Sequence, residues 1–139
     1  MTTAATAEAA APSEGFKLSE WIFTTDHKRI GILYLIGSIA ALFVAGLMAL
    51  GIRIEQYAIG ESGLINFFVG DFSGEMSTGD AYNVALYFHG AAMILAFLIP
   101  GLTGFAANYL IPLMIGAPDV AFPRINAFSV WLFWMGIVV

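Results

Sequence analysis

His89 is the residue of this chain whose type and surroundings best suit the binding of a metal-containing cofactor. It lies in the first part of a long uncharged segment that begins at Val84, and ionisable residues inside apolar spans are costly and usually functional. On a helix, Ala85, Ala92 and Ala96 would share its face and leave room for a flat macrocycle. Haem iron commonly takes a histidine nitrogen as axial ligand. The pattern equally fits a histidine hydrogen-bonded to another helix, with small residues there for close packing.

Asp119 is the second residue that could do chemistry, because it is a lone acid among apolar residues beside a short polar turn. Carboxylates exchange protons readily, and chains of such groups form proton relays. The amides of Asn108 and Asn126 could hold water, so that the three side chains would form a polar entrance. The alternative is a turn in which Asp119 caps a backbone N–H or pairs with Arg124. Local turn chemistry favours that alternative.

Three further polar residues flank the first apolar run. Arg53 follows it at about the depth of His89, where a guanidinium could bond a cofactor's carboxylate or carbonyl, or simply snorkel to the interface. Glu55 could bind a hard cation through oxygen, or be solvated. His27 has no second histidine and no cysteine near it, so we interpret it as an interfacial residue.

The composition places these side chains in a membrane protein. Of 139 residues, 60% are hydrophobic and 11% are charged, with a mean hydropathy of +0.86, whereas soluble domains are about 45–50% apolar and about 25% charged. Five basic residues against ten acidic ones give no footprint for nucleic acid. The absence of cysteine excludes disulfides and cysteine-ligated metals from this chain. The composition argues against a soluble enzyme, a disordered regulator and a nucleic-acid-binding protein.

Hydrophobic runs divide the chain into seven predicted segments. They are a disordered tail (1–14), a cytoplasmic interfacial segment (15–29), a first transmembrane helix (30–51), an external loop (52–83), a second, overlong transmembrane helix (84–117), a cytoplasmic turn (118–126) and the start of a third transmembrane helix (127–139). The first span, at 1.5 Å per residue, reaches about 33 Å and crosses a ~30 Å hydrocarbon core. The second contains Pro100 and Pro112 and is expected to be one kinked helix rather than two re-entrant halves.

The predicted fold is therefore an all-α polytopic membrane protein, part of a multi-helix transmembrane bundle with two full spans and the start of a third. The final apolar run has 13 residues, too few to cross, so we expect either a split gene product or an omitted remainder of that helix. Lys17, Lys28 and Arg29 precede the first span, Arg124 lies in the turn, and Arg53 alone lies in the loop. This bias predicts a cytoplasmic N-terminus.

Three stretches resemble subunit I of the haem–copper respiratory oxidases. Residues 24–34 (TTDHKRIGILY) are similar to the start of its helix one, and His89-Gly90 resembles its helix-two haem motif. Residues 108–113 (NYLIPL) and 115–126 (IGAPDVAFPRIN) are similar to its helix two–three junction. The order of the motifs also agrees, and the resemblance covers about residues 20–139, the amino-terminal portion of that subunit.

The resemblance implies a haem site. His89 would be one axial ligand of the low-spin haem, for which haem a is favoured, and Arg53 would contact that haem's peripheral substituent. Glu55 would fall at a position where some members bind a structural cation. Phe88 departs from the family pattern, in which small or flexible residues commonly precede the histidine, and this leaves the local packing open.

The resemblance also implies a proton path. Asp119 would be the cytoplasmic entrance of the D-pathway, Asn108 and Asn126 would line its first stretch, and Tyr34 would lie along it. Ala127 stands where some members have a second asparagine.

A complete oxidase would need groups that this chain lacks. Only two histidines are present, so the second axial ligand, the copper ligands, the high-spin haem ligand and the linked tyrosine would come from later helices, and this segment alone would be inactive. With the remaining helices of subunit I, other oxidase subunits and lipid, it would form a proton-pumping oxidase. That enzyme would pass electrons from cytochrome c through the low-spin haem to a haem–copper centre and reduce dioxygen to water.

Two alternatives remain open. One is a quinol-oxidising member of the same family, and the other is a small non-enzymatic membrane subunit that holds haem. The expected location is a bacterial cytoplasmic membrane, in preference to a mitochondrial inner membrane.

Overall fold

The computed structural model describes residues 17–57, 64–70 and 76–138, and the regular structure within these ranges is helical. The elements are α1 (Leu18–Ile22), α2 (His27–Tyr57), α3 (Leu64–Val69), α4 (Thr78–Ala91), the π-helical segments η1 (Ala92–Leu98) and η2 (Pro100–Ala106), α5 (Ala107–Ile115) and α6 (Pro123–Val138). The predicted tail, 1–14, lies outside the described residues.

Helix α2 is longer at both ends than the predicted span 30–51. Asp26 caps its start, because one carboxylate oxygen accepts a hydrogen bond from the backbone N–H of Lys28 at 3.1 Å. At the other end Arg53 and Glu55 lie inside the helix, since Arg and Glu are both good helix formers. With 31 residues, α2 extends about 46 Å at 1.5 Å per residue, so its ends reach past a ~30 Å hydrocarbon core.

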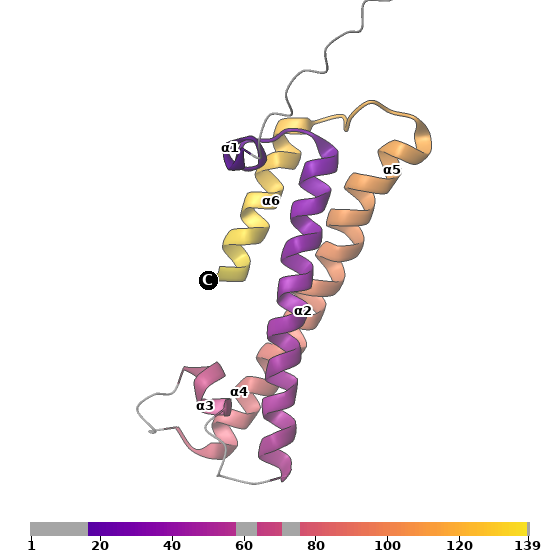
Figure 1. Ribbon diagram of the computed structural model, residues 1–139. Helices are drawn as coiled ribbons and strands as arrows, with labels where there is room; N and C mark the ends of the chain where they lie inside the picture. Colours follow the sequence, from indigo (N-terminus) through magenta and orange to yellow (C-terminus); the bar gives the residue numbers. More distant parts are fainter. Residues whose placement is uncertain (1–16, 58–63, 71–75, 139) are drawn as a thin grey trace, which may run out of the picture.

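The second apolar run forms one continuous helix from α4 through η1 and η2 to α5, rather than two re-entrant halves (Figure 1). Its irregularity lies at Pro100, where the two π-helical segments meet. Just before it, the N–H of Ile99 bonds the carbonyl of Ile94, five residues back. Proline removes a backbone donor, and π-helical winding is one way a helix accommodates such a position.

The helix ends at Gly116, inside the apolar run, for a conformational reason. Gly116 has φ 70°, a left-handed conformation in which glycine is not strained, and the N–H of Ala117 bonds the carbonyl of Pro112 at 2.9 Å. Helix α6 then starts at Pro123, which suits the first turn of a helix. The turn is therefore shorter than the predicted segment 118–126, and Arg124 and Asn126 belong to the first turn of α6.

Two apolar clusters hold the helices together at opposite ends of α2, and they define two regions. At the Asp119 end, Ile30, Tyr34 and Val130 are buried, with Leu33, Phe105, Ala127, Phe133 and Trp134 around them. At the His89 end, Met48, Ile52, Ile65, Ala81 and Ala85 are buried, with Phe68, Val69 and Tyr82 around them. In Figure 1, α6 runs beside the Asp119 end of α2, and α3 packs on α4 at the His89 end.

Glycines allow close approach at the Asp119 end. A β-carbon on Gly104 would overlap the ring of Tyr34, and one on Gly37 would lie 2.6 Å from Cε1 of Phe133. At both positions an aromatic side chain of a neighbouring helix packs directly on the glycine, and small residues at helix contacts are typical of helices packed in a membrane.

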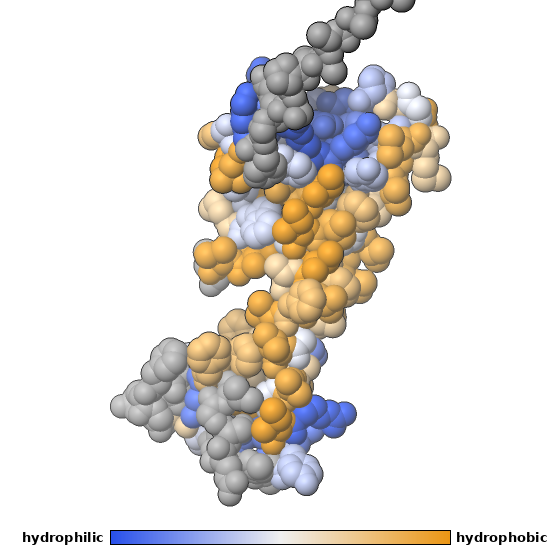
Figure 2. Space-filling view, in the orientation of Figure 1, coloured by the Kyte–Doolittle hydropathy of each residue, from blue (hydrophilic) through white to orange (hydrophobic). Residues whose placement is uncertain are grey.

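Much of the apolar surface is left uncovered. Helix α2 and the helix Gly79–Ile115 are long and apolar enough to cross a membrane, and only 39% and 11% of their most apolar windows are buried. Figure 2 shows hydrophobic residues along the middle of one face and hydrophilic residues gathered toward both ends. An apolar surface of this extent needs lipid or further helices as a partner.

Candidate functional site

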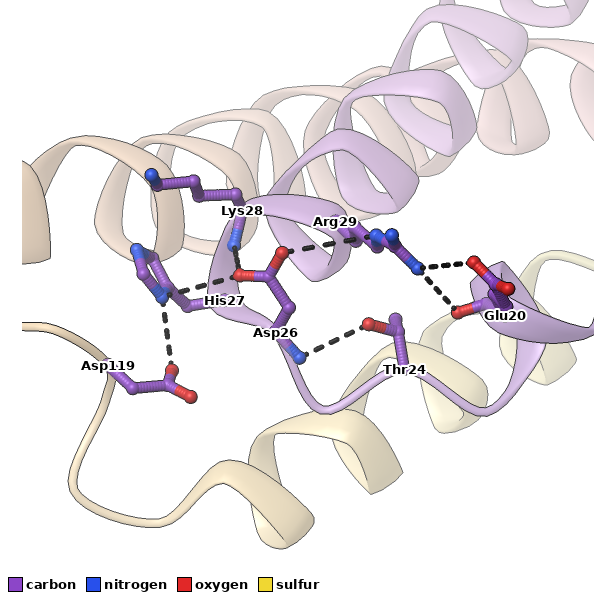
Figure 3. A network of polar contacts seen from close by, with 7 residues as sticks. All are labelled: Glu20, Thr24, Asp26, His27, Lys28, Arg29 and Asp119. Atoms are coloured by element: carbon purple, nitrogen blue, oxygen red, sulfur yellow. Dashed lines mark hydrogen bonds and ion pairs between the residues drawn. The ribbon is translucent and has the colours of Figure 1, made fainter. Parts of the chain in front are cut away.

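His27 is the centre of a polar site at the Asp119 end. Its ring is 3% exposed, although the sequence alone suggested an interfacial residue. The turn that follows α5 brings Asp119 to it, and Nδ1 of His27 lies 3.1 Å from Oδ1 of Asp119 (Figure 3). The two residues are 92 positions apart in the chain, so no local sequence pattern could have paired them.

The carboxylate of Asp119 determines which ring nitrogen of His27 carries a proton. An ionised carboxylate can only accept hydrogen bonds, so Nδ1–H donates and Nε2 keeps a lone pair. That Nε2 atom is buried and has no hydrogen-bond partner among the described residues. The same Oδ1 of Asp119 also accepts from the N–H of Val120 at 2.8 Å. The capping role considered from sequence is thus present, whereas the side chain that pairs with Asp119 is His27 and not the exposed Arg124.

The neighbouring acids Asp26 and Glu20 pair with Arg29, whereas Asp119 pairs with His27. Arg29 lies within 4.0 Å of both Asp26 and Glu20, and Oδ1 of Asp26 is 3.6 Å from Nδ1 of His27 (Figure 3). The side chain of Asp119 is 39% exposed. It can therefore exchange a proton with water on one side while it bonds a buried imidazole on the other.

A second polar chain joins α2 to α6 next to this pair. The hydroxyl of Tyr34 donates to Oγ of Ser129 at 2.8 Å, and Ser129 donates to the carbonyl of Asn126 at 2.7 Å. The side-chain nitrogen of Asn126 is buried without a partner among the described residues. Ser129 was not singled out from the sequence, where its only signal is the i+3 spacing from Asn126. Asn108 donates to the carbonyl of Gly104 in its own helix at 2.6 Å.

His89 occupies a different setting, on the α4 side of the contact with α2. Its Nδ1 lies 2.9 Å from the carbonyl oxygen of Ala45. A carbonyl can only accept, so Nδ1 carries the proton and Nε2 carries the lone pair. Histidines that ligate metals usually donate their other ring N–H in this way, which orients the ring. The two interpretations of His89 from sequence are therefore compatible, because each uses a different nitrogen.

The surroundings of His89 fit a flat macrocycle. A β-carbon on Gly90 would meet nothing within 4 Å. A hollow of about 460 Å³ lies next to His89, between α2, the α4–η1 region and the end of α6. His89 itself does not line it, and its lining combines small residues, among them Ala92 and Ala96, with the larger Phe88 and Leu95. Ala92 and Ala96, about one and two turns after His89, leave room for part of a flat macrocycle on this side of α4, and Phe88 and Leu95 border that space.

Arg53 and Glu55 lie near the C-terminal end of α2, which is Tyr57. Arg53 is exposed, and its Nη1 donates to Oε1 of Gln56 at 3.2 Å. Glu55 is 3% exposed, so the solvated state considered from sequence is not the one observed. In the described part of the chain no three His, Cys, Asp or Glu side chains gather as a metal site, and cation binding at Glu55 stays a prediction.

Comparison with known proteins relates most of the chain, beginning two residues after His27, to one family. Residues 29–139 match the family described as cytochrome c and quinol oxidase polypeptide I. The chain is 51% identical over 113 residues to the heme-copper oxidase subunit I+III of Aeropyrum pernix. It is 44% identical over 115 residues to cytochrome c oxidase subunit 1 of Corynebacterium diphtheriae, and 42% identical over 117 residues to the probable cytochrome c oxidase subunit 1-alpha of Streptomyces coelicolor.

The matches cover most of this chain and a small part of each relative. They include 81%, 83% and 84% of this chain, but 12%, 18% and 18% of the three relatives, in the same order. The chain thus spans less than a fifth of the length of these relatives.

Proposed function

Because the chain belongs to the family of cytochrome c and quinol oxidase polypeptide I, we propose that it forms the amino-terminal part of the catalytic subunit of a haem–copper terminal oxidase. In this proposal the enzyme passes electrons through a low-spin haem to a haem–copper centre and reduces dioxygen to water. The donor is cytochrome c, with quinol as the alternative. The other helices of the subunit, and other subunits, supply the high-spin haem and copper ligands.

His89 is the proposed axial ligand of the low-spin haem, with haem a favoured. The observation that carries this is the bond from Nδ1 to the carbonyl of Ala45 at 2.9 Å, because it orients the ring and leaves Nε2 for iron. The haem, when bound, supplies the electron-transfer chemistry. The chain's own contribution is ligation, orientation and electrostatics.

Arg53 is the proposed contact of the haem periphery. Its guanidinium has five N–H donors, of which one bonds Gln56. The remaining donors can bind a carbonyl or carboxylate at the edge of the macrocycle. A positive charge there favours the reduced haem, because reduction adds an electron.

Asp119 is the proposed entrance for protons, and His27 is its partner. Water reaches Asp119, whose carboxylate accepts a proton and bonds the buried imidazole of His27. Imidazole can accept a proton at the nitrogen that does not already carry one. Inside this pair, Asn126 and the Tyr34–Ser129 bond offer further polar groups along the inner face of α6. Asn108, which here bonds its own helix, would line the same entrance through its amide oxygen.

The proposed location is a bacterial cytoplasmic membrane, with the N-terminus and Asp119 on the cytoplasmic side. The uneven distribution of basic residues supports this orientation. Proton uptake from the cytoplasm would then begin at the end of α2 where His27 and Asp119 meet.

The two histidines of the chain provide a matched test. In the assembled oxidase, His89→Ala should abolish the absorption of the low-spin haem and lower the haem content by one per complex, since an axial ligand is lost. His27→Ala should keep that absorption and that haem content. An unchanged low-spin spectrum in His89→Ala would refute ligation by His89. Loss of the same haem in His27→Ala would show that the effect is not specific to the ligand.

A further inference from the structure

A polar bridge between α2 and α4 holds the side chain of Arg53. Nη1 of Arg53 donates to Oε1 of Gln56 at 3.2 Å, and Nε2 of Gln56 donates to the phenol oxygen of Tyr82 at 2.6 Å. A guanidinium can only donate, so the amide oxygen of Gln56 must face Arg53 and its nitrogen must face Tyr82. The two partners together determine the orientation of the amide.

Packing restricts the motion of Tyr82, the last residue of this bridge. Its side chain packs against the buried apolar cluster of the His89 end, and it precedes His89 by seven residues, about two helical turns, so both lie on one face of α4. Ala45 and Gln56 are 11 residues apart, about three turns, and share a face of α2. The hydrogen bonds His89–Ala45 and Gln56–Tyr82 therefore lie along the same contact between antiparallel helices (Figure 1).

Arg53 lies beside this contact, one turn before Gln56. It is eight residues from Ala45, about 12 Å along the helix axis. A long side chain without a partner samples many rotamers, and a tether removes much of that freedom before a ligand arrives. One N–H of Arg53 is used by Gln56, and the other N–H groups bond no acceptor among the described residues, so they can bind an acceptor outside this chain.

From this geometry we infer that Gln56 is a positioning residue, which together with Tyr82 holds the guanidinium of Arg53 beside the α2–α4 contact, where the edge of a low-spin haem bound at His89 would meet it. This inference rests on the proposed function, in which His89 ligates the haem and Arg53 contacts its periphery. Gln56 itself does not touch the haem; it acts by keeping the positive charge of Arg53 in one place.

Redox titration of the assembled oxidase tests the inference, with the midpoint potential and absorption maximum of the low-spin haem as readouts. Arg53→Met should lower the potential and shift the band, because a positive charge near the haem is removed. Gln56→Leu should shift both in the same direction by a smaller amount. Tyr82→Phe, which removes the anchoring phenol oxygen, should do the same. On the Arg53→Met background, Gln56→Leu should cause no additional shift.

Tyr57→Phe is the matched control for Tyr82→Phe, because it removes the same hydroxyl from a tyrosine that is 95% exposed, and it should leave both readouts unchanged. Unchanged readouts in Arg53→Met would remove the haem-edge role and the inference with it. A shift in Arg53→Met without one in Gln56→Leu and Tyr82→Phe would overturn the positioning role alone. A shift from Gln56→Leu that persists on the Arg53→Met background would also overturn it.

Discussion

The two histidines of this chain make the same kind of hydrogen bond at different levels of α2, one at its start and one near its middle, and they differ in what accepts it. Nδ1 of His27 bonds the carboxylate of Asp119 at 3.1 Å, whereas Nδ1 of His89 bonds the backbone carbonyl of Ala45 at 2.9 Å. Each bond leaves Nε2 with the lone pair. A carboxylate can exchange a proton, and a peptide carbonyl at ordinary pH cannot.

The difference teaches how one side chain type serves two proposed tasks. The partner of His27 is partly exposed to water and can carry charge, so the pair can take up and hold a proton. The partner of His89 is neutral and part of a helix backbone, so it orients the ring and leaves its other nitrogen for a metal. The surroundings agree, since Nε2 of His27 is buried and the region beside His89 is open.

Among the variants that test this difference between the two histidines, Asp119→Asn is expected to have the largest effect, which is on oxygen consumption. Unlike a carboxylate, an amide does not bind and release a proton at ordinary pH, so oxygen consumption by the assembled oxidase should fall, by about 10²-fold if Asp119 is the main proton acceptor. The low-spin haem spectrum should stay the same, because His89 bonds Ala45, which lies 18 residues, about 27 Å, along α2 from His27. Oxygen-electrode rates and proton uptake into vesicles measure the change.

Asp26→Asn is the matched control for that variant. Asp26 is also a carboxylate near His27, at 3.6 Å, but it caps α2, and asparagine caps helices equally well. It should therefore leave turnover nearly unchanged. Equal rates for Asp119→Asn and the unmodified enzyme would show that protons enter elsewhere, and the contrast between the two histidines would lose its functional meaning.

A smaller effect, on stability rather than chemistry, is expected for Gly104→Ala at the Asp119 end. The added carbon would overlap the ring of Tyr34, and such overpacking costs about 1–3 kcal/mol. The melting temperature of the complex should fall. Gly46→Ala in α2, where a β-carbon would meet nothing within 4 Å, is the control and should not lower it. An unchanged melting temperature in Gly104→Ala would mean that the close contact between α2 and η2 is not needed.

The smallest effect is expected for Ser129→Ala, which removes the acceptor of the Tyr34 hydroxyl. One such hydrogen bond contributes about 1 kcal/mol to the free energy of unfolding. A double-mutant cycle with Tyr34→Phe should give a coupling of about 0.5–1.5 kcal/mol, because the two side chains are in direct contact at 2.8 Å. If the two substitutions had additive effects on the free energy of unfolding, the Tyr34–Ser129 bond would be contradicted. Of the polar contacts at the Asp119 end, the His27–Asp119 pair would then remain.

The long helices could be predicted from hydrophobicity alone, and their exact limits could not. Helix α2 continues through Arg53 and Glu55 because charged residues with good helix propensity do not end a helix when its end leaves the apolar layer. The turn before α6 is short because Gly116 and Pro123 set its ends through backbone conformation, which a count of apolar residues does not detect. Pro100 predicted an irregularity in the second long helix. The sequence did not predict its form, because a kink and π-helical winding can both accommodate a proline.

Individual residues of the candidate site could be proposed from the sequence, but the groups that they bond could not. His89 and Asp119 stood out because they are polar groups in apolar surroundings, and that signal is local. His27 was missed because its burial depends on Asp119, 92 positions away. Ser129 and Gln56 were missed because serine and glutamine are common at many positions. Their roles follow only from the side chains that they bond in the folded chain.

The sequence by itself determined that this chain is a helical membrane protein of the haem–copper oxidase family, because hydrophobic runs and ordered motifs are properties of the linear chain. Only the tertiary structure decided which oxygen accepts the proton of each histidine, whether Glu55 is buried, and which side chain tethers Arg53. The reason is physical. Hydrophobicity acts on every residue according to its own type, whereas a hydrogen bond requires two groups at about 3 Å, and only folding brings distant residues to that distance.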